Sequence, residues 1–595
     1  MTEVDASPST APMGRSPSVR DGVSLAALAA LVHAPSLFNG LTNWDDPQYV
    51  SGNPIAASGA RGLWLAISAP FDDAWYPLTQ LGYLLLHALA GPSPFAHHLA
   101  QPAHFAMAAA LVPAALSAFG VPRRAALVAA VLWIVHPFRV ESVAWAANLK
   151  DTLSLPLVLA AFALYGRGRP RAGAFAFASA LLAKSMVFPV ALLLPLAARR
   201  SGVSWREALR RAVPWLLPAG AVAVVALMLH LRGGVAHHGP AGGNGVLGAL
   251  PTALWLPWWY LGRVVWPAAP RAIYDFAPVG PLDWRLGLAL ALWTAFGALL
   301  WWRRRECSGW VLGAAAWLLP LAAVLGLVPL GFLVAERYTL LPSLALAAAI
   351  GLAVEGLRGR SRAVALTVVS VASLAMAVVT VHRQRDWRDA VSLWEANRTV
   401  APNAAAARFN LAGAYGAQGR WKEAAAELET VRRLDPHGRV QSPLDVGLML
   451  FLARMPEGDG ADEALAHYQR IRDEAPRRPE VLLEVASDVL AKGHVEAARA
   501  LLEPALHGPL GAAAHLLLAR AELDRGDLEQ GIAHTLVAVD RDAAHEGVLI
   551  TLAVELLRRG EWLYAERVAS RRCRSPRTDA ILRGLRAAAL EKLGS

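Results

Sequence analysis

Cysteine and charge are both scarce in this 595-residue chain, and nucleotide-binding loops are missing from it. Its two cysteines, Cys307 and Cys573, lie far apart with no CxxC or zinc-ligand spacing, so the sequence predicts neither a disulfide framework nor a cysteine-based metal site. No Walker loop or Rossmann glycine fingerprint occurs, which argues against nucleotide-driven transport and a soluble nucleotide-sugar site. Charged residues make up only 17% of the chain, too little for an ordinary soluble protein.

Hydrophobic residues account for 55% of the chain, and the long apolar runs lie almost entirely within residues 1–382. That part carries 27 Lys and Arg against 15 Asp and Glu, whereas residues 383–595 carry 30 against 31. Because the C-terminal part is neutral, it lacks the basic surface that nucleic-acid binding requires. We therefore predict a membrane body followed by a soluble domain, in contact with membrane lipids and with no nucleic acid as partner.

A helix that crosses a bilayer needs about 20 mainly apolar residues, and fewer when flanking side chains reach the interface. Eleven spans are predicted, near residues 22–40, 99–120, 122–138, 152–166, 172–184, 186–198, 212–231, 286–302, 309–332, 338–355 and 363–382. Residues 1–21, rich in Ser, Thr and Pro, are predicted to form a disordered tail. The Trp-rich run 251–267 and residues 77–90 are assigned to the outer interface, where Trp and Tyr concentrate.

The arginine clusters set the predicted orientation. With eleven spans, one face collects 18 basic residues and the other 9, and Lys/Arg-rich short loops stay in the cytoplasm. The N-terminus is then cytoplasmic and the C-terminal domain extracytoplasmic, as in a multi-pass protein of a bacterial inner membrane.

Residues 405–595 show a period of about 34 residues, typical of tetratricopeptide helix pairs. The first unit contains Asn410-Leu411-Ala412 and the turn glycine Gly419, and later turn glycines are Gly493, Gly526 and Gly560. About five repeats are predicted, with residues 383–404 as a linker helix. Such solenoids mostly bind peptides or proteins on a concave face.

The polar motif that most strongly suggests a function follows the first predicted span, where Asp45 and Asp46 are adjacent. Two neighbouring carboxylates raise each other's proton affinity, so that one could act as a base near neutral pH. A solvated turn or a helix cap is the alternative interpretation, because Asp-Asp-Pro is a favourable turn sequence.

Further ionisable residues lie in the other predicted outer loops: His136, Glu141, Lys150, Asp151, Lys184, Glu336, Arg337 and Tyr338. Charged groups at membrane depth are costly and need partners, which indicates a cavity or a structural ion-pair network. Lys184 could bind phosphate or could simply extend to the interface. Arg337 could contact phosphate through two nitrogens, or form a structural pair with Glu336.

Taken in order, several motifs resemble the transmembrane and tetratricopeptide-repeat-containing O-mannosyltransferase-like family: NWDDPQYV, WYPLTQL, HPFRVESVAWAANLKD, LLAKSMVFP, ERYTLLP and WRDAVSLWE, followed by the repeats. The resemblance covers about residues 22–590. It implies a GT-C type fold, which is an all-α multispanning bundle, followed by a C-terminal repeat domain. It also implies that the protein transfers sugars from polyprenyl-phosphate carriers at the outer face of the membrane.

The resemblance also implies roles for individual residues. Asp45 and Asp46 match the first-loop acidic pair, one of which would be the catalytic base. Matches to substrate-binding motifs fall on His136, Glu141, Lys150, Asp151, Lys184, Glu336, Arg337 and Tyr338. A hydroxyl acceptor, expected to be a protein Ser or Thr bound by the repeats, would displace the lipid phosphate with inversion. No resident cofactor or metal is predicted, although paired acids make a divalent ion conceivable.

Other classes of function remain as alternatives. A transporter would show inverted repeats around a midplane site, and no such symmetry is visible in the sequence. A non-catalytic membrane scaffold would tolerate Asp45→Asn. A glycan ligase or polymerase using the same lipid carrier would depend on arginine and histidine instead of the acidic pair.

Overall fold

The computed structural model describes residues 18–71, 74–232, 245–302, 307–327, 332–436, 502–508 and 510–594, together with a few positions between 483 and 499. Within these ranges the chain forms helices and no β-strand, apart from an isolated bridge between Phe71 and Ala74. The predicted all-α fold is confirmed. The chain divides into two compact units, Met1–Ala417 and Gln418–Ser595.

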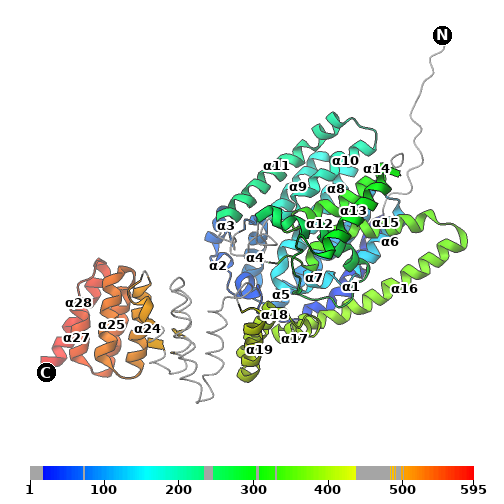
Figure 1. The fold of residues 1–595 in the computed structure, drawn as a ribbon. Helices are drawn as coiled ribbons and strands as arrows, with labels where there is room; N and C mark the ends of the chain where they lie inside the picture. Colours follow the sequence, from blue (N-terminus) through cyan, green and yellow to red (C-terminus); the bar gives the residue numbers. More distant parts are fainter. Residues whose placement is uncertain are drawn as a thin grey trace, which may run out of the picture. The chain divides into compact units, whose positions relative to one another are not determined.

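The first unit is a helical bundle (Figure 1). Its longer helices are α1 (Val19–His33), α4 (Pro77–Ala90), α5 (Pro94–Ser117), α6 (Arg123–Ile134), α8 (Leu149–Gly166), α9 (Pro170–Ala183), α11 (Trp205–Arg232), α12 (Gly245–Val265), α13 (Trp284–Trp302), α14 (Cys307–Ala322), α15 (Pro342–Gly356), α16 (Gly359–Arg383), α17 (Ala390–Val400) and α18 (Ala405–Ala417).

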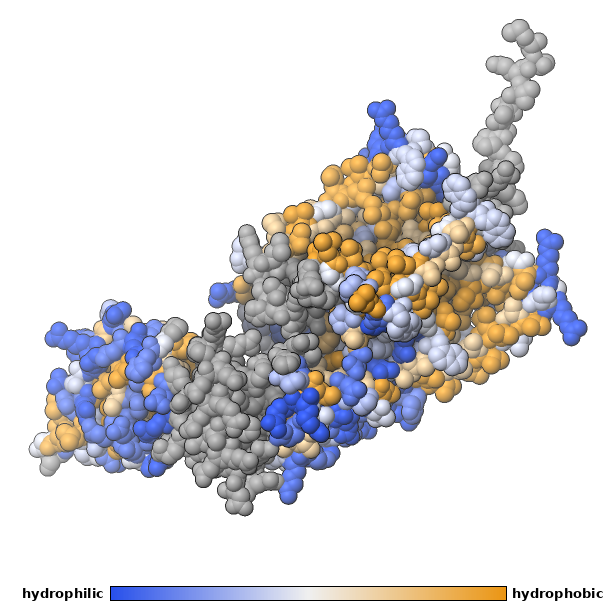
Figure 2. Space-filling model, viewed as in Figure 1, coloured by the Kyte–Doolittle hydropathy of each residue, from blue (hydrophilic) through white to orange (hydrophobic). Residues whose placement is uncertain are grey.

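Six described helices are long and apolar enough to cross a membrane: Val19–Phe38, Pro94–Ser117, Ala146–Gly166, Trp205–Leu229, Trp284–Trp302 and Gly359–Trp387. They indicate a membrane protein, and Figure 2 shows hydrophobic side chains over much of the visible face of this unit. The other five predicted spans correspond to shorter helices, such as α6 and α9. The orientation of the chain stays a prediction. Of the predicted disordered tail 1–21, residues 1–17 lie outside the described residues, whereas Val19, Arg20 and Asp21 belong to helix α1, which Ser18 caps.

Local sequence signals explain where α1 begins and how it packs. Ser18 caps the helix: its hydroxyl accepts a hydrogen bond from the Asp21 N–H, and its own N–H donates to the Asp21 carboxylate. This reciprocal arrangement satisfies two free donors at a helix start. Arg123, at the start of α6, pairs with Asp21 at 2.5 Å. These contacts join the beginnings of α1 and α6.

The core of the bundle lies among α5, α6, α8 and α9, and is filled by small and aromatic side chains such as Ala108, Phe105, Trp133 and Phe177. Alanine and glycine permit close helix approach in a bundle where lipid offers little hydrophobic driving force. At the crossing of α15 and α6, a Cβ at Gly351 would lie 2.2 Å from the Ala125 carbonyl oxygen. This crossing therefore requires glycine.

The polar motifs lie in short, irregular elements between the long helices. These elements are η1 (Ala34–Phe38), the π-helical turn η2 (Pro47–Ser51), α2 (Pro54–Ala57), α3 (Ala60–Ser68), α7 (Arg139–Ala144), η3 (Ala146–Asn148), η4 (Ser185–Leu192), α10 (Leu193–Arg200), η6 (Glu336–Thr339) and η7 (Gln384–Trp387). Single π-turns occur frequently at functional sites, whereas 3-10 turns are common connectors between helices.

The second unit contains α19 (Trp421–Leu434), η9 (Glu503–Ala505), α24 (Gly511–Asp524), α25 (Leu528–Arg541), η10 (Ala543–His545), α26 (Gly547–Arg559), α27 (Trp562–Ala569) and α28 (Pro576–Gly594). Helix α26 buries Leu549, Leu552, Ala553 and Leu556, the spacing of an amphipathic helix. Figure 1 shows α24 to α28 stacked in sequence order.

Three of the predicted turn glycines, Gly419, Gly526 and Gly560, have positive φ angles, a conformation that glycine adopts without strain. The fourth, Gly493, lies outside the described residues, as does nearly all of the second predicted repeat. The count of five repeats and the predicted domain boundaries stay predictions. The first unit continues to Ala417, beyond the predicted end of the membrane body at residue 382.

Candidate functional site

Asp46 is completely buried and hydrogen-bonded on both carboxylate oxygens. Its Oδ2 accepts from the Thr42 N–H at 2.6 Å and from the Thr42 hydroxyl at 2.9 Å, and its Oδ1 accepts from the Ala147 N–H at 2.8 Å. Burial raises the pKa of Asp46 to about 6, although the hydrogen bonds from Thr42 and Ala147 oppose the rise. Asp46 thus fastens the first outer loop to the turn before α8.

Asp45 differs from its neighbour because it is partly exposed. Its backbone carbonyl accepts hydrogen bonds from the N–H groups of Gln48 and Tyr49, which start the π-helical turn η2. Burial raises the pKa of the Tyr83 phenol, and the charges of Asp46, Asp45 and Asp151 add to that rise. All three carboxylates therefore lie close enough to the Tyr83 hydroxyl to influence its pKa.

Trp44, next to Asp45, is the centre of an aromatic cluster. Its ring stacks on Trp145 with centroids 4.4 Å apart and lies edge-to-face with Phe332 at 5.5 Å and with Trp394 at 5.4 Å. The guanidinium carbon of Arg337 lies 5.8 Å from the Trp44 ring and 5.4 Å from that of Trp145. Segments distant in sequence thus meet at the residue preceding Asp45.

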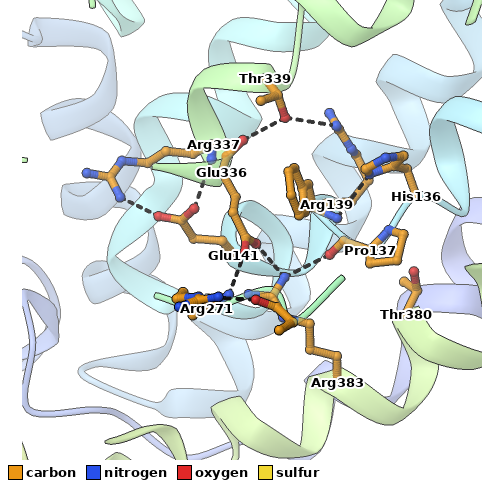
Figure 3. Close-up of polar contacts among 12 residues, drawn as sticks. His136, Pro137, Arg139, Glu141, Arg271, Glu336, Arg337, Thr339, Thr380 and Arg383 are labelled. Atoms are coloured by element: carbon orange, nitrogen blue, oxygen red, sulfur yellow. Dashed lines mark hydrogen bonds and ion pairs between the residues drawn. The ribbon is translucent and has the colours of Figure 1, made fainter. Parts of the chain in front are cut away.

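Glu141 and Arg337 form a buried pair. Glu141 is fully buried, and its carboxylate accepts hydrogen bonds from both the backbone N–H and the guanidinium of Arg337 (Figure 3). The sequence left open whether Arg337 pairs with Glu336, and the partner is instead Glu141. The pair joins α7 to η6.

Glu336 belongs to a second part of the network. One carboxylate oxygen accepts from the Arg271 N–H at 2.6 Å and the Tyr274 hydroxyl at 2.8 Å, and the other lies 2.5 Å from Arg383 (Figure 3). Burial raises the pKa of Glu336, and the positive charge of Arg383 opposes the rise. Arg383 also donates to the Pro137 carbonyl at 2.8 Å. Glu336 therefore acts as a structural link between outer loops.

Lys184 and Asp151 form an ion pair that lines a small cavity of about 40 Å³. Arg337 and Tyr338 line the same cavity, with apolar side chains from η4, α14 and the start of α15. The predicted residues Asp151, Lys184, Arg337 and Tyr338 are thus brought together, although they come from three separate sequence motifs. Both cations of this cavity are paired with carboxylates, Lys184 with Asp151 and Arg337 with Glu141. A phosphate attached to a hydrocarbon chain would therefore share the cations with these carboxylates.

Two further, mainly apolar cavities adjoin this one in turn. The first, of about 140 Å³, shares the lining residues Val190, Pro320 and Leu341 with the Lys184 cavity. The next, of about 730 Å³, shares Arg200 and Gly309, among others, with the cavity of 140 Å³. A series of adjoining apolar cavities therefore extends from Lys184 and Arg337 into the bundle.

Lys150 and His136 have other environments. The Lys150 ammonium lies 5.3 Å from the Tyr49 ring centre and 5.9 Å from that of Tyr76, so its charge contacts aromatic faces. His136 is buried: Nδ1 accepts from the Phe138 N–H at 3.2 Å, which leaves Nε2 to donate to the Val264 carbonyl at 2.9 Å. His136 is therefore structural and is not among the residues that line the Lys184 cavity.

Among the described residues, no group of three or more His, Cys, Asp or Glu is placed to hold a metal ion. Sequence reasoning missed four residues that complete the network: Asn43, Trp44, Arg271 and Arg383. Arg271 and Arg383 could have been found as isolated cations on the face that the positive-inside rule leaves poor in charge. Asn43 and Trp44 carried no signal beyond their position next to the acidic pair.

Comparison with known proteins gives one partial similarity. The chain is 36% identical over 110 residues to the protein O-mannosyl-transferase Tmtc2 of Drosophila melanogaster, a match that covers 18% of this chain and 12% of that protein. No family model matches the chain. This short similarity suggests a glycosyltransferase and supports the O-mannosyltransferase-like resemblance only in part.

Proposed function

We propose that this chain is an integral membrane glycosyltransferase that moves a hexose, with mannose as the first candidate, from a polyprenyl-phosphate carrier to a hydroxyl group. The acceptor is proposed to be a protein Ser or Thr at the outer face, bound by C-terminal tetratricopeptide repeats. The observation that carries the proposal is the cavity that unites Lys184 and Arg337 and adjoins further apolar cavities, near the loop of Asp45. The partial similarity to an O-mannosyltransferase supports the same class.

Asp45 is the proposed base. Asp46 is fully buried and spends both carboxylate oxygens on hydrogen bonds to the fold, whereas Asp45 is partly exposed. A base must come within hydrogen-bond reach of the proton that it removes, which favours the accessible carboxylate. Asp46 then positions the loop that carries Asp45.

The proposed reaction is a single displacement. Asp45 accepts the proton of the acceptor hydroxyl while the oxygen forms a bond to the anomeric carbon. The bond from that carbon to the phosphate oxygen breaks, and its electron pair leaves with the lipid phosphate, so that the sugar inverts. Lys184 and Arg337 stabilise the negative charge that develops on the phosphate in a partly dry cavity. Because phosphate is a good leaving group, no second carboxylate is needed as an acid.

The apolar cavities account for the choice of a lipid-linked donor. A hydrocarbon chain gains about 0.8 kcal/mol for each CH₂ group that it buries, and the two adjoining cavities offer about 140 and 730 Å³ beyond the cations. A water-soluble sugar phosphate would leave this apolar volume unused.

The test is transfer from radiolabelled polyprenyl-phosphate mannose in nanodiscs, with wild type, Asp45→Asn and Asp46→Asn compared. We expect Asp45→Asn to lose about 10²-fold or more in rate with unchanged stability, as for a lost general base, and Asp46→Asn to lose stability as well. Asp283→Asn, which disturbs only the local Asp283 pair with Arg285, is the matched control. Absence of transfer and hydrolysis in wild type across several lipid-linked sugars, with partner capture retained, would favour the scaffold alternative.

A further inference from the structure

The largest of the three adjoining cavities, of about 730 Å³, lies among α10, α12, α13, α14 and α15. Aromatic side chains such as Trp258 and Trp293 line it, and small residues such as Gly313 leave space that larger side chains would fill. Trp310 and Leu352, which also line it, are 48% and 44% exposed, so the cavity reaches the surface of the bundle. Its volume falls within the range of about 300–1,000 Å³ that is typical of ligand sites.

Arg200 provides a positive charge at this cavity. It ends α10, and among the described residues that line the cavity it alone is charged. Its guanidinium donates to the Phe119 carbonyl at 3.2 Å, and no carboxylate of the described residues forms an ion pair with it. Lys184 and Arg337, by contrast, are each paired with a carboxylate. A guanidinium with unpaired N–H groups beside an apolar cavity suits a phosphate that carries hydrocarbon chains.

The indole N–H of Trp258 indicates that the ligand also carries an acceptor oxygen. The Trp258 Nε1 is shielded from solvent and has no hydrogen-bond partner among the described residues. The Trp293 ring lies 5.0 Å from that of Trp258, and its N–H instead donates to the Leu254 carbonyl at 2.9 Å. Buried donors without partners are rare, because the loss of their contacts with water is not repaid. An oxygen of a bound molecule would supply the missing acceptor.

Arg200 and Lys184 lie at opposite ends of one continuous helical segment, which η4 and α10 form. Eight residues of 3-10 helix and eight of α-helix span at most about 28 Å, close to the roughly 30 Å of a hydrocarbon core. In the predicted orientation, Lys184 is then at the outer face and Arg200 at the cytoplasmic face. Basic pockets between membrane helices at the cytoplasmic face bind the headgroups of anionic lipids.

We infer that the cavity of 730 Å³ binds an anionic glycerophospholipid of the cytoplasmic leaflet, with its phosphate on Arg200 and an acyl chain among α12 to α15. The Trp258 N–H donates to one of the oxygen atoms of the lipid. This phospholipid site goes beyond the proposed function and does not depend on it, because Arg200 lies at the end of the cavity series remote from Lys184. The hydrocarbon chain of the proposed donor would enter from the Lys184 end, and the two lipids would share the series of cavities.

The experiment measures lipid binding to the full, delipidated chain in detergent by native mass spectrometry. The probes are dioleoyl-phosphatidylglycerol, which is anionic, and dioleoyl-phosphatidylcholine, which has the same acyl chains and no net charge. We expect one phosphatidylglycerol per chain, bound about 10-fold or more tightly than phosphatidylcholine, as for a charge-assisted contact. Equal binding of the two lipids by wild type would overturn the inference.

Substitutions of Arg200 test the phosphate contact. Arg200→Gln should lower the affinity for phosphatidylglycerol to that for phosphatidylcholine, and Arg200→Lys should keep most of the difference because it retains the charge. Arg199→Gln is the matched control, since it removes the same charge from the same helical turn, whereas Arg199 does not line the cavity and donates to the Val203 carbonyl. A preference that survives Arg200→Gln, or that Arg199→Gln abolishes equally, contradicts the assignment.

Two further variants test the acyl-chain and oxygen contacts. A Cβ at Gly313 has open space around it, so Gly313→Leu should fill part of the cavity without a clash. Displacement of two CH₂ groups lowers affinity by about 10-fold, and both lipids should be affected. Trp258→Phe keeps the ring and removes the unpaired N–H. It should weaken both lipids by about 3-fold and leave the melting temperature of the lipid-free protein unchanged or higher.

The same variants distinguish the phospholipid from the lipid carrier of the proposed donor. Undiminished binding of both phospholipids in Gly313→Leu would show that their acyl chains lie elsewhere. Polyprenyl phosphate is the third probe, and its binding should be insensitive to Arg200→Gln. If polyprenyl phosphate displaces phosphatidylglycerol and loses its affinity in Arg200→Gln, this end of the cavity series belongs to the carrier and the phospholipid site is refuted.

Discussion

The carboxylate of Glu141 holds Arg337 at two points, the backbone N–H and the guanidinium group. The Glu141 side chain has no exposed surface and that of Arg337 is 11% exposed. The pair therefore fixes both the course of η6 and the direction of the cation that lines the Lys184 cavity. For the proposed function, this pairing would preorganise the Arg337 cation before a phosphate binds.

Glu141→Gln should destabilise the protein strongly. Removal of one partner from a buried pair leaves the other charge uncompensated, which costs about 3–5 kcal/mol. The measurement is thermal unfolding in one detergent. The matched control is Glu355→Gln, because the Glu355 pair with Arg362 is partly exposed at both side chains and such pairs contribute about 0–1 kcal/mol. Similar losses in the two variants would contradict the structural role of Glu141.

Lys184→Met should weaken donor binding and also destabilise the fold, because it leaves the buried Asp151 carboxylate without its partner. A phosphate in the cavity would lose one of two cations, and we expect donor KM to rise by about 10-fold or more, equivalent to about 1.4 kcal/mol. Lys184→Arg should recover part of the affinity, since it keeps the charge. Binding of radiolabelled donor measures the effect, with Arg206→Gln, on an exposed position of α11, as control. Unchanged donor affinity in Lys184→Met would remove Lys184 from the phosphate site.

The sequence predicted the fold class well because apolar runs of about 20 residues have few alternatives to membrane helices. It predicted span lengths less well. The runs 172–184 and 186–198 are too short to decide by composition, and in the structure the second becomes a 3-10 segment, η4, followed by α10. The hydropathy of a short run does not predict the 3-10 segment that follows Lys184, because that segment depends on tertiary packing.

The candidate site was predicted residue by residue but not as a set of contacts. Asp45 and Asp46 are indistinguishable in sequence, and only the fold shows that Asp46 is the buried one. The partner of Arg337 is 196 positions away in Glu141, whereas sequence proximity favoured Glu336. The pairing of charged residues across a bundle depends on helix packing, and residue spacing along the chain does not predict it.

Gly351→Ala should destabilise the bundle. A Cβ at this position would meet the Ala125 backbone carbonyl at 2.2 Å, and backbone cannot move aside without separating α15 from α6. Overpacking of this kind costs about 1–3 kcal/mol. Gly356→Ala on the same helix has open space around the added carbon and should leave the melting temperature nearly unchanged. Equal melting temperatures for the two variants would show that α15 and α6 are not packed as closely as described.

Asp46 should make a contribution to stability that falls as pH rises from about 4 to about 6, and it is measured as the difference between wild type and Asp46→Asn. Its folded pKa of about 6 lies above the ordinary value of 3.8, so the folded state holds a proton that the unfolded state has released. The stabilisation is complete below the ordinary pKa and is lost as pH rises through the folded pKa, on the order of 3 kcal/mol in all. Because the Asp46→Asn variant cannot titrate at this position, the melting temperature of wild type minus that of Asp46→Asn should decrease over this range. Parallel melting curves against pH for wild type and Asp46→Asn would show that the buried carboxyl keeps an ordinary pKa, in which case the hydrogen bonds from Thr42 and Ala147 outweigh its burial.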